Sequence, residues 1–491
     1  MKQLKELLSG LDVKIYGPET IGISDIVFDS RRVTPGCLFV ALRGAKVDGR
    51  DFIPAAIKAG ARAVVSDQST AIEGATLVAA SDPLAILAPL SLRFWDNPSK
   101  KLLMIGITGT NGKTTTSYIL ESIFNAAGWK IGVMGTINYR FSGKCEPAPN
   151  TTPFASEIQR FLAAAANAGG RAVIMEVSSH ALALGRIGGV DFDVAVFTNL
   201  TQDHLDFHNT LEEYGRAKSL LFEGIDPQSD KPYARRAVLN MDDPWSERIK
   251  GVSRVPVTGY RLNRQADVFA KKIESDASGS SFVLQGPRGL SLPVRLRLVG
   301  EYNVLNALAA AAAALSQGID PEAIRKGLET IKGVPGRMER IDTDKPFSVI
   351  VDFAHTDDAL RNTMAALRRL KPARLLTVFG CGGDRDRTKR PLMGEVAARM
   401  SDEVIVTSDN PRSEDPQKIT LDVEVGIRRV RSDHYEIIVD REEAIDKALH
   451  MARPGDIVLL AGKGHETYQI LHDKTVPFDD REVARKLLKN L

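Results

Sequence analysis

The segment GITGTNGKTT occupies residues 106–115, between an apolar run at 102–107 and a helix-like stretch at 117–127. Glycines followed by Lys-Thr at a strand-to-helix turn are typical of a phosphate-binding loop, in which backbone N–H groups surround the anion and the lysine reaches the terminal phosphates. The usual template G-x-x-x-x-G-K-[ST] requires glycine at position 107, which is isoleucine here. Because strand, G-K-T and helix occur in the required order, the segment favours a nucleotide site over an incidental glycine-rich turn.

The composition is that of an ordinary globular protein: among 491 residues, 43% are hydrophobic, 26% are charged, and the net charge is +3. Such a small charge gives no indication of a nucleic-acid partner. Cys37, Cys145 and Cys381 form no C-x-x-C pair, which suits a reducing compartment and provides no metal framework. The N-terminus has no signal-peptide pattern, and the longest apolar block, at 307–315, is too short to span a bilayer. We expect a cytoplasmic monomer without membrane insertion.

Strand-like and helix-like runs alternate along the chain, which predicts an α/β fold, here in three domains. Residues 1–98 are predicted to form a small N-terminal α/β domain. Residues 99–333 are predicted to form a central P-loop ATPase-like domain with a mostly parallel sheet and a β insertion at about 255–300. Residues 334–491 are predicted to form a Rossmann-like, doubly wound domain, in which ligands bind at the carboxyl ends of the strands.

Two polar segments follow strand-like runs of the central part. In RAVIMEVSS (171–179), Glu176 ends the strand and offers the oxygen ligand that a hard cation prefers, although a helix-capping carboxylate is an equal alternative. TNLTQDHLDFH (198–208) carries His204 and His208 at the i, i+4 spacing of a zinc pair. From these residues alone, a zinc hydrolase therefore stays an alternative.

Lys218 lies in the helix-like segment LEEYGRAKSLLF, where it shares a stripe with Leu211, Tyr214 and Leu221. This spacing predicts that the lysine faces inward. From spacing alone, its stem is expected to reach a surface carboxylate. A buried lysine can also lose its proton and become a nucleophile, which leaves a chemical role open.

Taken together, these motifs resemble the ATP-dependent Mur ligase family of peptidoglycan synthesis. The loop of that family is G-x-x-G-T-x-G-K-[ST], which does not need glycine at position 107. It is matched by Gly106, Gly109, Thr110, Gly112, Lys113 and Thr114. Further similar motifs lie in all three predicted domains, so the resemblance covers nearly the whole chain.

The resemblance implies a site for ATP and Mg²⁺. The implied ATP-binding residues are Gly109, Thr110, Asn111, Gly112, Lys113, Thr114, Thr115, Asn303, Arg337 and Asp352, with Asn306 beside Asn303 in the segment near the adenine. The implied metal ligands are Thr114, Glu176, His204 and Lys218, the last as N6-carboxylysine formed with carbon dioxide. Lys113, Glu176, His204 and Lys218 are implied as catalytic, whereas His208 is expected to be structural.

N-terminal segments such as FDSR (28–31) and DGRDF (48–52) resemble one Mur branch, which binds the UDP end of a UDP-N-acetylmuramoyl-peptide. The residues implied for UDP-N-acetylmuramoyl-L-alanyl-D-glutamate are Phe28, Ser30, Ala45, Lys46, Val47, Asn150, Thr151, Thr152, Ser178 and Arg186. Leu184 stands where some members carry a glutamine contact, so one substrate hydrogen bond is not supported here.

The motif DNPR (409–412) bears on the amino acid that is added. A guanidinium binds a carboxylate in a planar fork, and meso-diaminopimelate has one carboxylate more than lysine. Mur ligases that add meso-diaminopimelate carry D-N-P-R, whereas lysine-adding relatives lack its arginine, so Arg412 implies diaminopimelate. The implied ligands are Arg385, Asp409, Asn410, Pro411, Arg412, Gly462 and Glu466.

The expected activity is ATP-dependent addition of meso-2,6-diaminopimelate to UDP-N-acetylmuramoyl-L-alanyl-D-glutamate through an acyl phosphate, giving ADP and phosphate. Two alternatives stay open: a Mur ligase that adds L-lysine, and a ligase similar to folylpolyglutamate synthetase. The second would share the loop and Lys218 but would lack the N-terminal UDP unit and D-N-P-R.

Overall fold

The structure is a computed structural model that describes residues 1–44, 47–276, 279–472 and 474–491. The chain forms two compact units. The first comprises Met1–Gly106, Trp129–Asp193 and Gly224–Arg235, and the second comprises Ile107–Gly128, Val194–Glu223 and Arg236–Leu491. The chain first passes from the first unit to the second within strand β8 (Leu103–Thr108). No helix among the described residues is long and apolar enough to cross a membrane.

The N-terminal part of the first unit is a five-stranded sheet in the order β2-β7-β6-β5-β4. Side chains of β5 alternate between two cores: Leu38 and Val40 pack with residues of α1 and α3, whereas Phe39 packs with residues of α2. In chain order the elements are β1 (Lys2–Gln3), α1 (Leu4–Leu8), β2 (Lys14–Tyr16), β3 (Gly22–Ile23), β4 (Ile26–Val27), β5 (Leu38–Val40), α2 (Ile53–Lys58), β6 (Ala63–Ser66), β7 (Thr76–Ala79) and α3 (Pro83–Phe94), with 3-10 turns at Ser30–Arg32, Gly49–Phe52 and Pro98–Lys101.

The rest of the first unit contributes strands in the order β11-β10-β9-β12, with β12 parallel to β9 and a β10–β11 hairpin. The elements are β9 (Ile131–Met134), β10 (Asn138–Phe141), β11 (Lys144–Pro147), α5 (Ala155–Asn167), β12 (Ala172–Glu176) and α6 (Ser179–Ala183). Helix α5 is tied to the N-terminal sheet because Arg160 donates to both carboxylate oxygens of Asp25, at 2.9 Å each.

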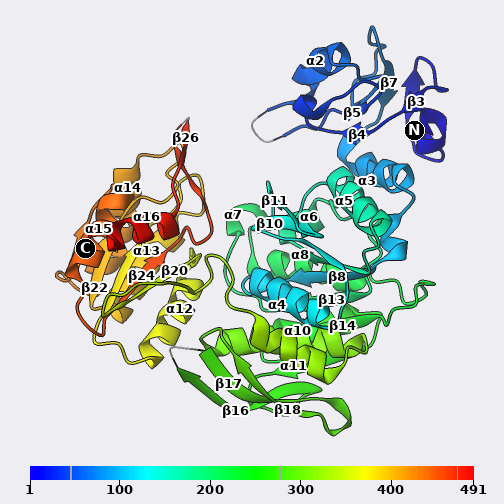
Figure 1. The fold of residues 1–491 in the computed structure, drawn as a ribbon. Coiled ribbons are helices and arrows are strands. Elements are labelled where there is room, and N and C mark those ends of the chain that lie inside the picture. Colours follow the sequence, from blue (N-terminus) through cyan, green and yellow to red (C-terminus); the bar gives the residue numbers. More distant parts are fainter. Residues whose placement is uncertain (45–46, 277–278, 473) are drawn as a thin grey trace. The chain divides into compact units, whose positions relative to one another are not determined.

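The second unit begins with parallel strands β13 to β16, followed by the antiparallel strands β17 and β18. Its elements are α4 (Lys113–Ala126), β13 (Val194–Phe197), α7 (Leu205–His208), α8 (Leu211–Glu223), β14 (Arg236–Asn240), α9 (Trp245–Val252), β15 (Val257–Arg261), β16 (Val268–Asp276), β17 (Gly279–Gln285), a 3-10 turn (Pro287–Gly289), β18 (Ser291–Leu296), α10 (Glu301–Ser316) and α11 (Pro321–Thr330). The predicted mostly parallel sheet with a β insertion is confirmed. The alanines of α10 are buried, and this small-residue helix packs against α4 (Figure 1).

The C-terminal sheet of the second unit has the order β19-β20-β24-β21-β22-β23. Ile350 of β20 packs in one core with α12, α13 and α14, whereas Val349 and Val351 pack in another with α15 and α16. Helices cover both faces, so the predicted doubly wound fold is confirmed. The elements are β19 (Glu339–Ile341), β20 (Ser348–Asp352), α12 (Asp357–Arg369), β21 (Leu375–Phe379), α13 (Lys389–Met400), β22 (Glu403–Val406), α14 (Pro416–Arg428), β23 (Tyr435–Ile437), α15 (Arg441–Met451), β24 (Ile457–Ala461), β25 (Tyr468–Leu471), β26 (Lys474–Pro477) and α16 (Asp480–Leu488).

Candidate functional site

The glycines of the loop before α4 are required by its close contacts. Gly109 has φ +151°, and a Cβ there would lie 1.8 Å from Thr198 Oγ1. Gly112 has φ +88°, and a Cβ there would lie 2.4 Å from Asn306 Oδ1. Ile107 lies inside β8 and is fully buried, so position 107 is a core strand position rather than part of the turn.

Lys113 is the first residue of α4 and turns back over the loop. Its Nζ donates to the carbonyl oxygens of Gly109 at 2.8 Å and Thr110 at 2.9 Å. The loop is fixed to the segment after β13, since Asn111 N donates to Asn199 Oδ1 at 2.9 Å. An ammonium and a helix N-terminus therefore meet at one fixed turn, which is the arrangement that binds a phosphate. Thr114 and Thr115 are buried in the first turn of the helix.

Lys218 faces inward from α8 with 1% of its surface exposed. Its Nζ lies 4.1 Å from the centroid of the Tyr214 ring. Burial lowers the pKa of Lys218 well below its usual value, and the charge of Lys113 lowers it further. The neutral amine, which is the nucleophilic form, is therefore favoured. The predicted inward stripe is wrong for Leu211, which is 44% exposed because it is the first residue of the helix.

The ring of Tyr214 contacts the rings of both His204 and His208. Tyr214 was not among the predicted site residues. The ring of His204 lies 6.0 Å from it and the ring of His208 lies 5.2 Å from it. His204 adopts a left-handed conformation, with φ 55°, before α7, and its Nε2 lies 3.4 Å from Asp203 Oδ2. The described residues contain no cluster of three or more His, Cys, Asp or Glu side chains arranged to hold a metal ion.

Two residues predicted to bind ATP from the C-terminal segment behave differently. Arg337 reaches the loop helix, where its Nη2 lies 3.5 Å from Thr114 Oγ1. Asp352 instead accepts hydrogen bonds from Met338 N at 2.7 Å, Ala354 N at 3.0 Å and Thr363 Oγ1 at 3.0 Å. Burial raises the pKa of Asp352. Its carboxylate is thus engaged by three protein donors, and its contact with ATP stays a prediction.

The predicted asparagines of α10 form a small network beside the loop. Asn303 Nδ2 donates to Val299 O at 2.8 Å, and its Oδ1 accepts from Asn306 Nδ2 at 3.2 Å. Asn306 Oδ1 in turn lies 3.4 Å from Thr116 Oγ1 of α4. Asn306 therefore contacts helix α4 directly, whereas Asn303 is connected to that helix through Asn306.

In the first unit, Glu176 ends β12 with 1% of its surface exposed. Its carboxylate accepts from Thr136 N at 3.1 Å and from Thr136 Oγ1 at 2.7 Å. A Cβ on Gly135 would lie 2.4 Å from Glu176 Oε1, so the chain passes close to the carboxylate. Thr136 orients Glu176 but was not predicted, because it lies 40 residues away in the sequence.

Several residues predicted to bind the muramoyl-peptide lie around Phe154 in the same unit. The Phe28 ring centroid lies 4.7 Å from that of Phe154, and the guanidinium of Arg186 lies 4.3 Å from the Phe154 centroid. Arg186 Nε is buried without a hydrogen-bond partner among the described residues, and burial lowers the pKa of Arg186. A desolvated guanidinium with a donor to spare suits an anionic ligand.

Most of the other residues predicted to bind the muramoyl-peptide make local hydrogen bonds or are exposed. The Thr152 hydroxyl donates to Glu176 O at 2.8 Å and accepts from Ser178 N at 2.9 Å, and Ser178 Oγ caps α6. Thr151 Oγ1 lies 3.2 Å from Thr136 Oγ1, and Asn150 O accepts from Tyr139. Ser30 begins a 3-10 turn, and Val47 and Leu184 are exposed. Ala45 and Lys46 lie outside the described residues.

Arg412 is held at the carboxyl ends of the C-terminal strands in a left-handed conformation, with φ 53°. Its N donates to Ile470 O at 3.1 Å, and its Nη1 donates to Gly383 O at 2.7 Å. Burial lowers the pKa of Arg412, and the nearby positive charge of Arg385 lowers it further. Among the described residues, neither arginine has a carboxylate within ion-pair distance. Two guanidiniums therefore lie near one another, and the carboxylates of Asp409, Glu466 and Asp384 act on Arg412 only from beyond ion-pair distance.

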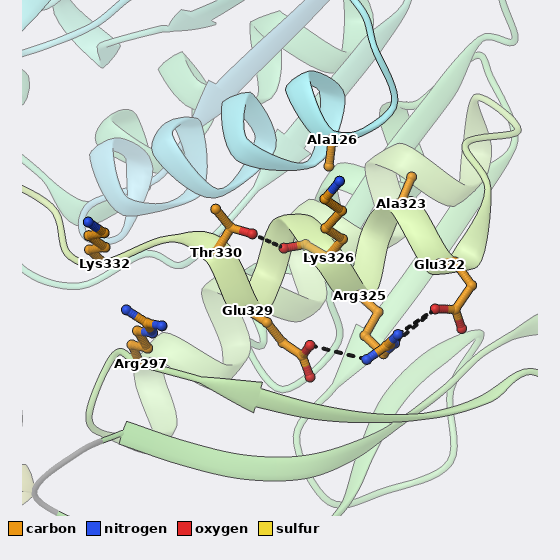
Figure 2. A pocket seen from close by; sticks show the side chains of 9 residues that line it. All are labelled: Ala126, Arg297, Glu322, Ala323, Arg325, Lys326, Glu329, Thr330 and Lys332. Carbon is orange, nitrogen blue, oxygen red and sulfur yellow. Dashed lines mark hydrogen bonds and ion pairs between the residues drawn. The ribbon is translucent and has the colours of Figure 1, made fainter.

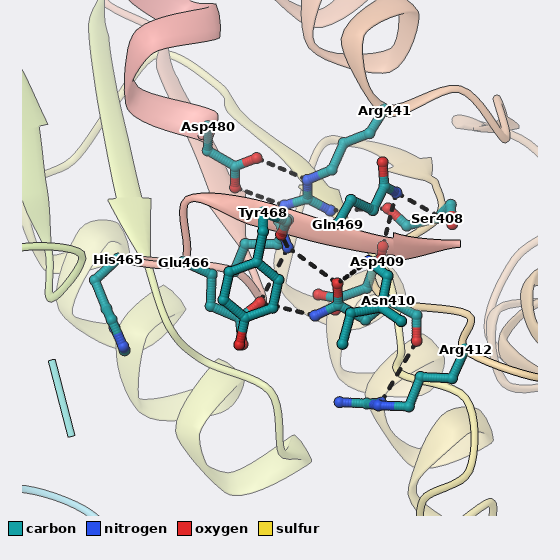
Figure 3. Close-up of polar contacts among 12 residues, drawn as sticks. Ser408, Asp409, Asn410, Arg412, Arg441, His465, Glu466, Tyr468, Gln469 and Asp480 are labelled. Carbon is teal, nitrogen blue, oxygen red and sulfur yellow. Dashed lines mark hydrogen bonds and ion pairs between the residues drawn. The ribbon is translucent and has the colours of Figure 1, made fainter. Parts of the chain in front are cut away.

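Glu466 lies beside this region and completes a polar network (Figure 3). Its Oε2 accepts from Asn410 Nδ2 at 2.8 Å and from Lys463 Nζ at 3.0 Å. Burial and the neighbouring carboxylate of Asp409 raise the pKa of Glu466. Gly462 has φ +110°, and a Cβ there would lie 2.7 Å from Asp409 Oδ2. The remaining predicted residue, Pro411, is buried in the same loop.

One surface pocket of about 500 Å³ contains none of the predicted site residues (Figure 2). It lies between the C-terminal end of α4, at Ala126, and α11, whereas Lys113 is at the opposite end of α4. Arg325 is paired there with Glu322 and Glu329. Because it holds none of the predicted residues and its Arg325 is engaged by two glutamates, this pocket is not a strong candidate for the site.

Three family models match the chain in succession. They are described as "Mur ligase family, catalytic domain" for residues 22–90, "Mur ligase middle domain" for residues 107–314, and "Mur ligase, glutamate ligase domain" for residues 336–464. Together they cover most of the sequence, including the loop before α4 and the D-N-P-R motif.

Curated relatives match over nearly the full length. A UDP-N-acetylmuramoyl-L-alanyl-D-glutamate--2,6-diaminopimelate ligase of Syntrophomonas wolfei is 45% identical over 489 residues, covering 99% of each chain. The enzyme of the same name from Solibacter usitatus is 49% identical over 468 residues, covering 95% of this chain and 94% of the relative.

Solved structures show the same fold. One is a structure of UDP-N-acetylmuramoyl-L-alanyl-D-glutamate--2,6-diaminopimelate ligase. It has a TM-score of 0.66 at 33% identity, and the match covers 100% of this chain and 99% of that one. MurF ligase of Thermotoga maritima in complex with ADP has a TM-score of 0.67 at 20% identity, covering 95% of this chain and 97% of that one.

Proposed function

The chain belongs to the Mur ligase family, and from this premise we propose that it adds meso-2,6-diaminopimelate to UDP-N-acetylmuramoyl-L-alanyl-D-glutamate in peptidoglycan synthesis. It is an ATP-dependent ligase. The observation that supports this amino acid most directly is the half-buried guanidinium of Arg412 beside the positive charge of Arg385, since neither arginine forms an ion pair among the described residues and Asp409, Glu466 and Asp384 act on Arg412 only at longer range. A substrate with a second carboxylate supplies the missing anion.

ATP binding rests on the loop before α4. Backbone N–H groups and the Lys113 ammonium bind the phosphates, and the lysine exchanges its contacts with two loop carbonyls for contacts with phosphate oxygens. Arg337, which already lies at Thr114, adds a second positive charge. The backbone N–H groups of the loop are fixed before the reaction, so they stabilise charge on the transferring phosphoryl group with little rearrangement.

The donor set suits Mg²⁺. By the family resemblance, Thr114 would supply a hydroxyl, Glu176 a carboxylate, His204 an imidazole, and Lys218 a further carboxylate once it is carbamylated. Mg²⁺ is usually held by one or two carboxylates together with substrate phosphates. When bound, Mg²⁺ neutralises negative charge on the phosphates.

Two successive displacements account for the chemistry. An oxygen of the D-glutamate side carboxylate attacks the γ-phosphorus, the bond to the β-phosphate oxygen breaks, and an acyl phosphate and ADP form. The neutral amine of diaminopimelate then attacks the acyl carbon, expels phosphate and loses a proton. Binding both substrates in fixed positions supplies much of the acceleration, as in other phosphoryl transfers.

Recognition of the two substrates is divided between named residues. Arg186, which lies over the Phe154 ring, binds an anionic part of the muramoyl-peptide, and Phe28 also contacts that ring. Arg412 and Arg385 bind the carboxylate at the non-reacting end of diaminopimelate, and Glu466 binds the ammonium there. We place residues 1–98 in a domain that binds the muramoyl-peptide, residues 99–333 in a domain that binds ATP, and residues 334–491 in a domain that binds the amino acid. We place the enzyme in the cytoplasm, where ATP is available.

Release of phosphate tests this function. Purified protein is incubated with ATP, Mg²⁺, UDP-N-acetylmuramoyl-L-alanyl-D-glutamate and either meso-diaminopimelate or L-lysine. We expect phosphate release to require the muramoyl-peptide and diaminopimelate together, with at least about 100-fold lower kcat/KM for L-lysine, because lysine leaves the two arginines without their carboxylate. Release with L-lysine alone would assign the chain to the lysine-adding branch. Release with a folate substrate would favour the folylpolyglutamate alternative.

A further inference from the structure

Lys463 is a fully buried lysine directly after β24, and the residues that hold it belong to the proposed diaminopimelate site. Its Nζ donates to Glu466 Oε2 at 3.0 Å, to Tyr468 O at 2.6 Å and, at 3.4 Å, to Asn410 Oδ1. Burying an ammonium is costly unless it is paired and hydrogen-bonded. The carboxylate that satisfies Lys463 is the one that Glu466 presents to the site.

Asn410 has little capacity left for a ligand, although it was predicted to be one. Its Nδ2 donates to Glu466 (Figure 3). Its Oδ1 accepts from Ile470 N at 2.9 Å and faces Lys463. Asn410 and Lys463 therefore hold the same oxygen of Glu466 from two sides, and the hairpin β25–β26 fixes Asn410.

Other charged groups near Glu466 do not replace Lys463. Arg441 is fully buried and paired with Asp480, which is also fully buried, at 2.7 Å. Asp409 is a like charge, and Arg412 donates to Gly383 O rather than to Glu466. Tyr468 contributes its backbone carbonyl to Lys463, and the nearby His465 stays neutral because burial lowers its pKa to about 3. Lys463 is thus the cation in direct contact with Glu466.

We propose that Lys463 is a positioning residue that keeps Glu466 ionised and oriented to bind the ammonium group of the incoming diamino acid. This inference rests on the proposed function. Without Lys463, Glu466 would lie buried beside Asp409 with no cation in contact, and its neutral form would be favoured. A protonated Glu466 loses the charge that attracts the substrate ammonium.

The pH profile of kcat/KM for diaminopimelate separates this role from a merely structural one. Glu466 must be ionised to bind, so kcat/KM falls as the pH drops through its pKa in the free enzyme. Removing Lys463 raises that pKa, so the acidic limb moves to higher pH. For Lys463→Met and Lys463→Gln we expect the limb to rise by about one pH unit or more, which corresponds to roughly a tenfold loss of kcat/KM at pH values below the wild-type limb. The KM values for ATP and the muramoyl-peptide should stay within about twofold of the wild-type values, because Lys463 does not contribute to binding those two substrates.

A double-mutant cycle gives the second readout. Glu466→Gln removes the titrating group, so adding Lys463→Met to it should cost little further kcat/KM for diaminopimelate. Lys418→Met, which removes an exposed lysine charge from α14 of the same domain, is the matched control and should leave the profile unchanged.

Three results would overturn the inference: an unmoved acidic limb in both single variants, additive losses in the cycle, or loss of the folded state in both variants. The last would assign Lys463 to the stability of the domain. If the wild-type protein does not use diaminopimelate at all, the proposed function fails instead, so the two failures are distinguishable.

Discussion

Replacing Lys218 with alanine should lower kcat for ligation by about 1000-fold, which corresponds to about 4 kcal/mol of transition-state stabilisation. The side chain is buried against Tyr214, and burial lowers its pKa well below the usual value, which shifts the amine toward the neutral form that the proposed reaction with carbon dioxide requires. The proposed carbamate would convert the lysine into an anionic oxygen ligand for Mg²⁺, and the alanine variant would lack that ligand. Steady-state phosphate release at saturating substrates measures the effect.

Three comparisons identify the carbamate as the cause. Lys218→Arg keeps a positive charge but cannot form the carbamate, so it should be as inactive as the alanine variant. Formate or acetate should partly restore Lys218→Ala, because each supplies a carboxylate to the vacated space. Lys250→Ala removes an exposed lysine of the neighbouring helix α9 and should be fully active. Full activity of Lys218→Arg would contradict the account.

Replacing Arg412 with alanine should lower kcat/KM for meso-diaminopimelate by about 100-fold or more, since a half-buried guanidinium that binds a substrate carboxylate contributes a few kcal/mol. The KM for ATP should change little, because Arg412 belongs to the amino-acid site. The preference for diaminopimelate over L-lysine should fall by a similar factor. Steady-state kinetics with each amino acid measure both quantities.

Arg412→Lys provides the graded comparison. A lysine keeps the charge but loses the planar fork, so it should recover only part of kcat/KM. Arg399→Ala, in which an exposed arginine of α13 loses its pair with Glu395, is the matched control and should behave like the wild type. Equal losses for diaminopimelate and ATP would show that Arg412 supports the fold rather than the specificity.

The fold was largely predictable because its signals are local. A strand, a glycine-rich turn and a helix follow one another around Lys113, and the order of apolar runs indicated a parallel sheet. Leu211 was misplaced because the first residue of a helix need not follow the stripe of the helix interior. The short strands β19 and β23 and the hairpin β25–β26 were not predicted, because strands this short show little alternation of apolar and polar residues in the sequence.

The candidate site was predicted mainly through its motifs, and the missing residues are those whose partners are distant in sequence. Thr136 becomes relevant only when the fold brings it to Glu176. Lys463 lies between the predicted residues Gly462 and Glu466 in the sequence, but its pairing with Asn410 and Glu466 depends on how two loops meet. Tyr214 was placed on the inward stripe, yet its contact with both histidines could not be derived from helical spacing.

The transfer of oxygen from substrate to phosphate tests the central claim most directly. The muramoyl-peptide is prepared with ¹⁸O in both oxygens of the D-glutamate side carboxylate and is turned over with ATP, Mg²⁺ and diaminopimelate. If the carboxylate attacks the γ-phosphorus, one labelled oxygen leaves with each phosphate and the other stays in the new amide, as mass spectrometry of both products would show. Unlabelled phosphate, with amide still formed, would contradict an acyl-phosphate mechanism at this site.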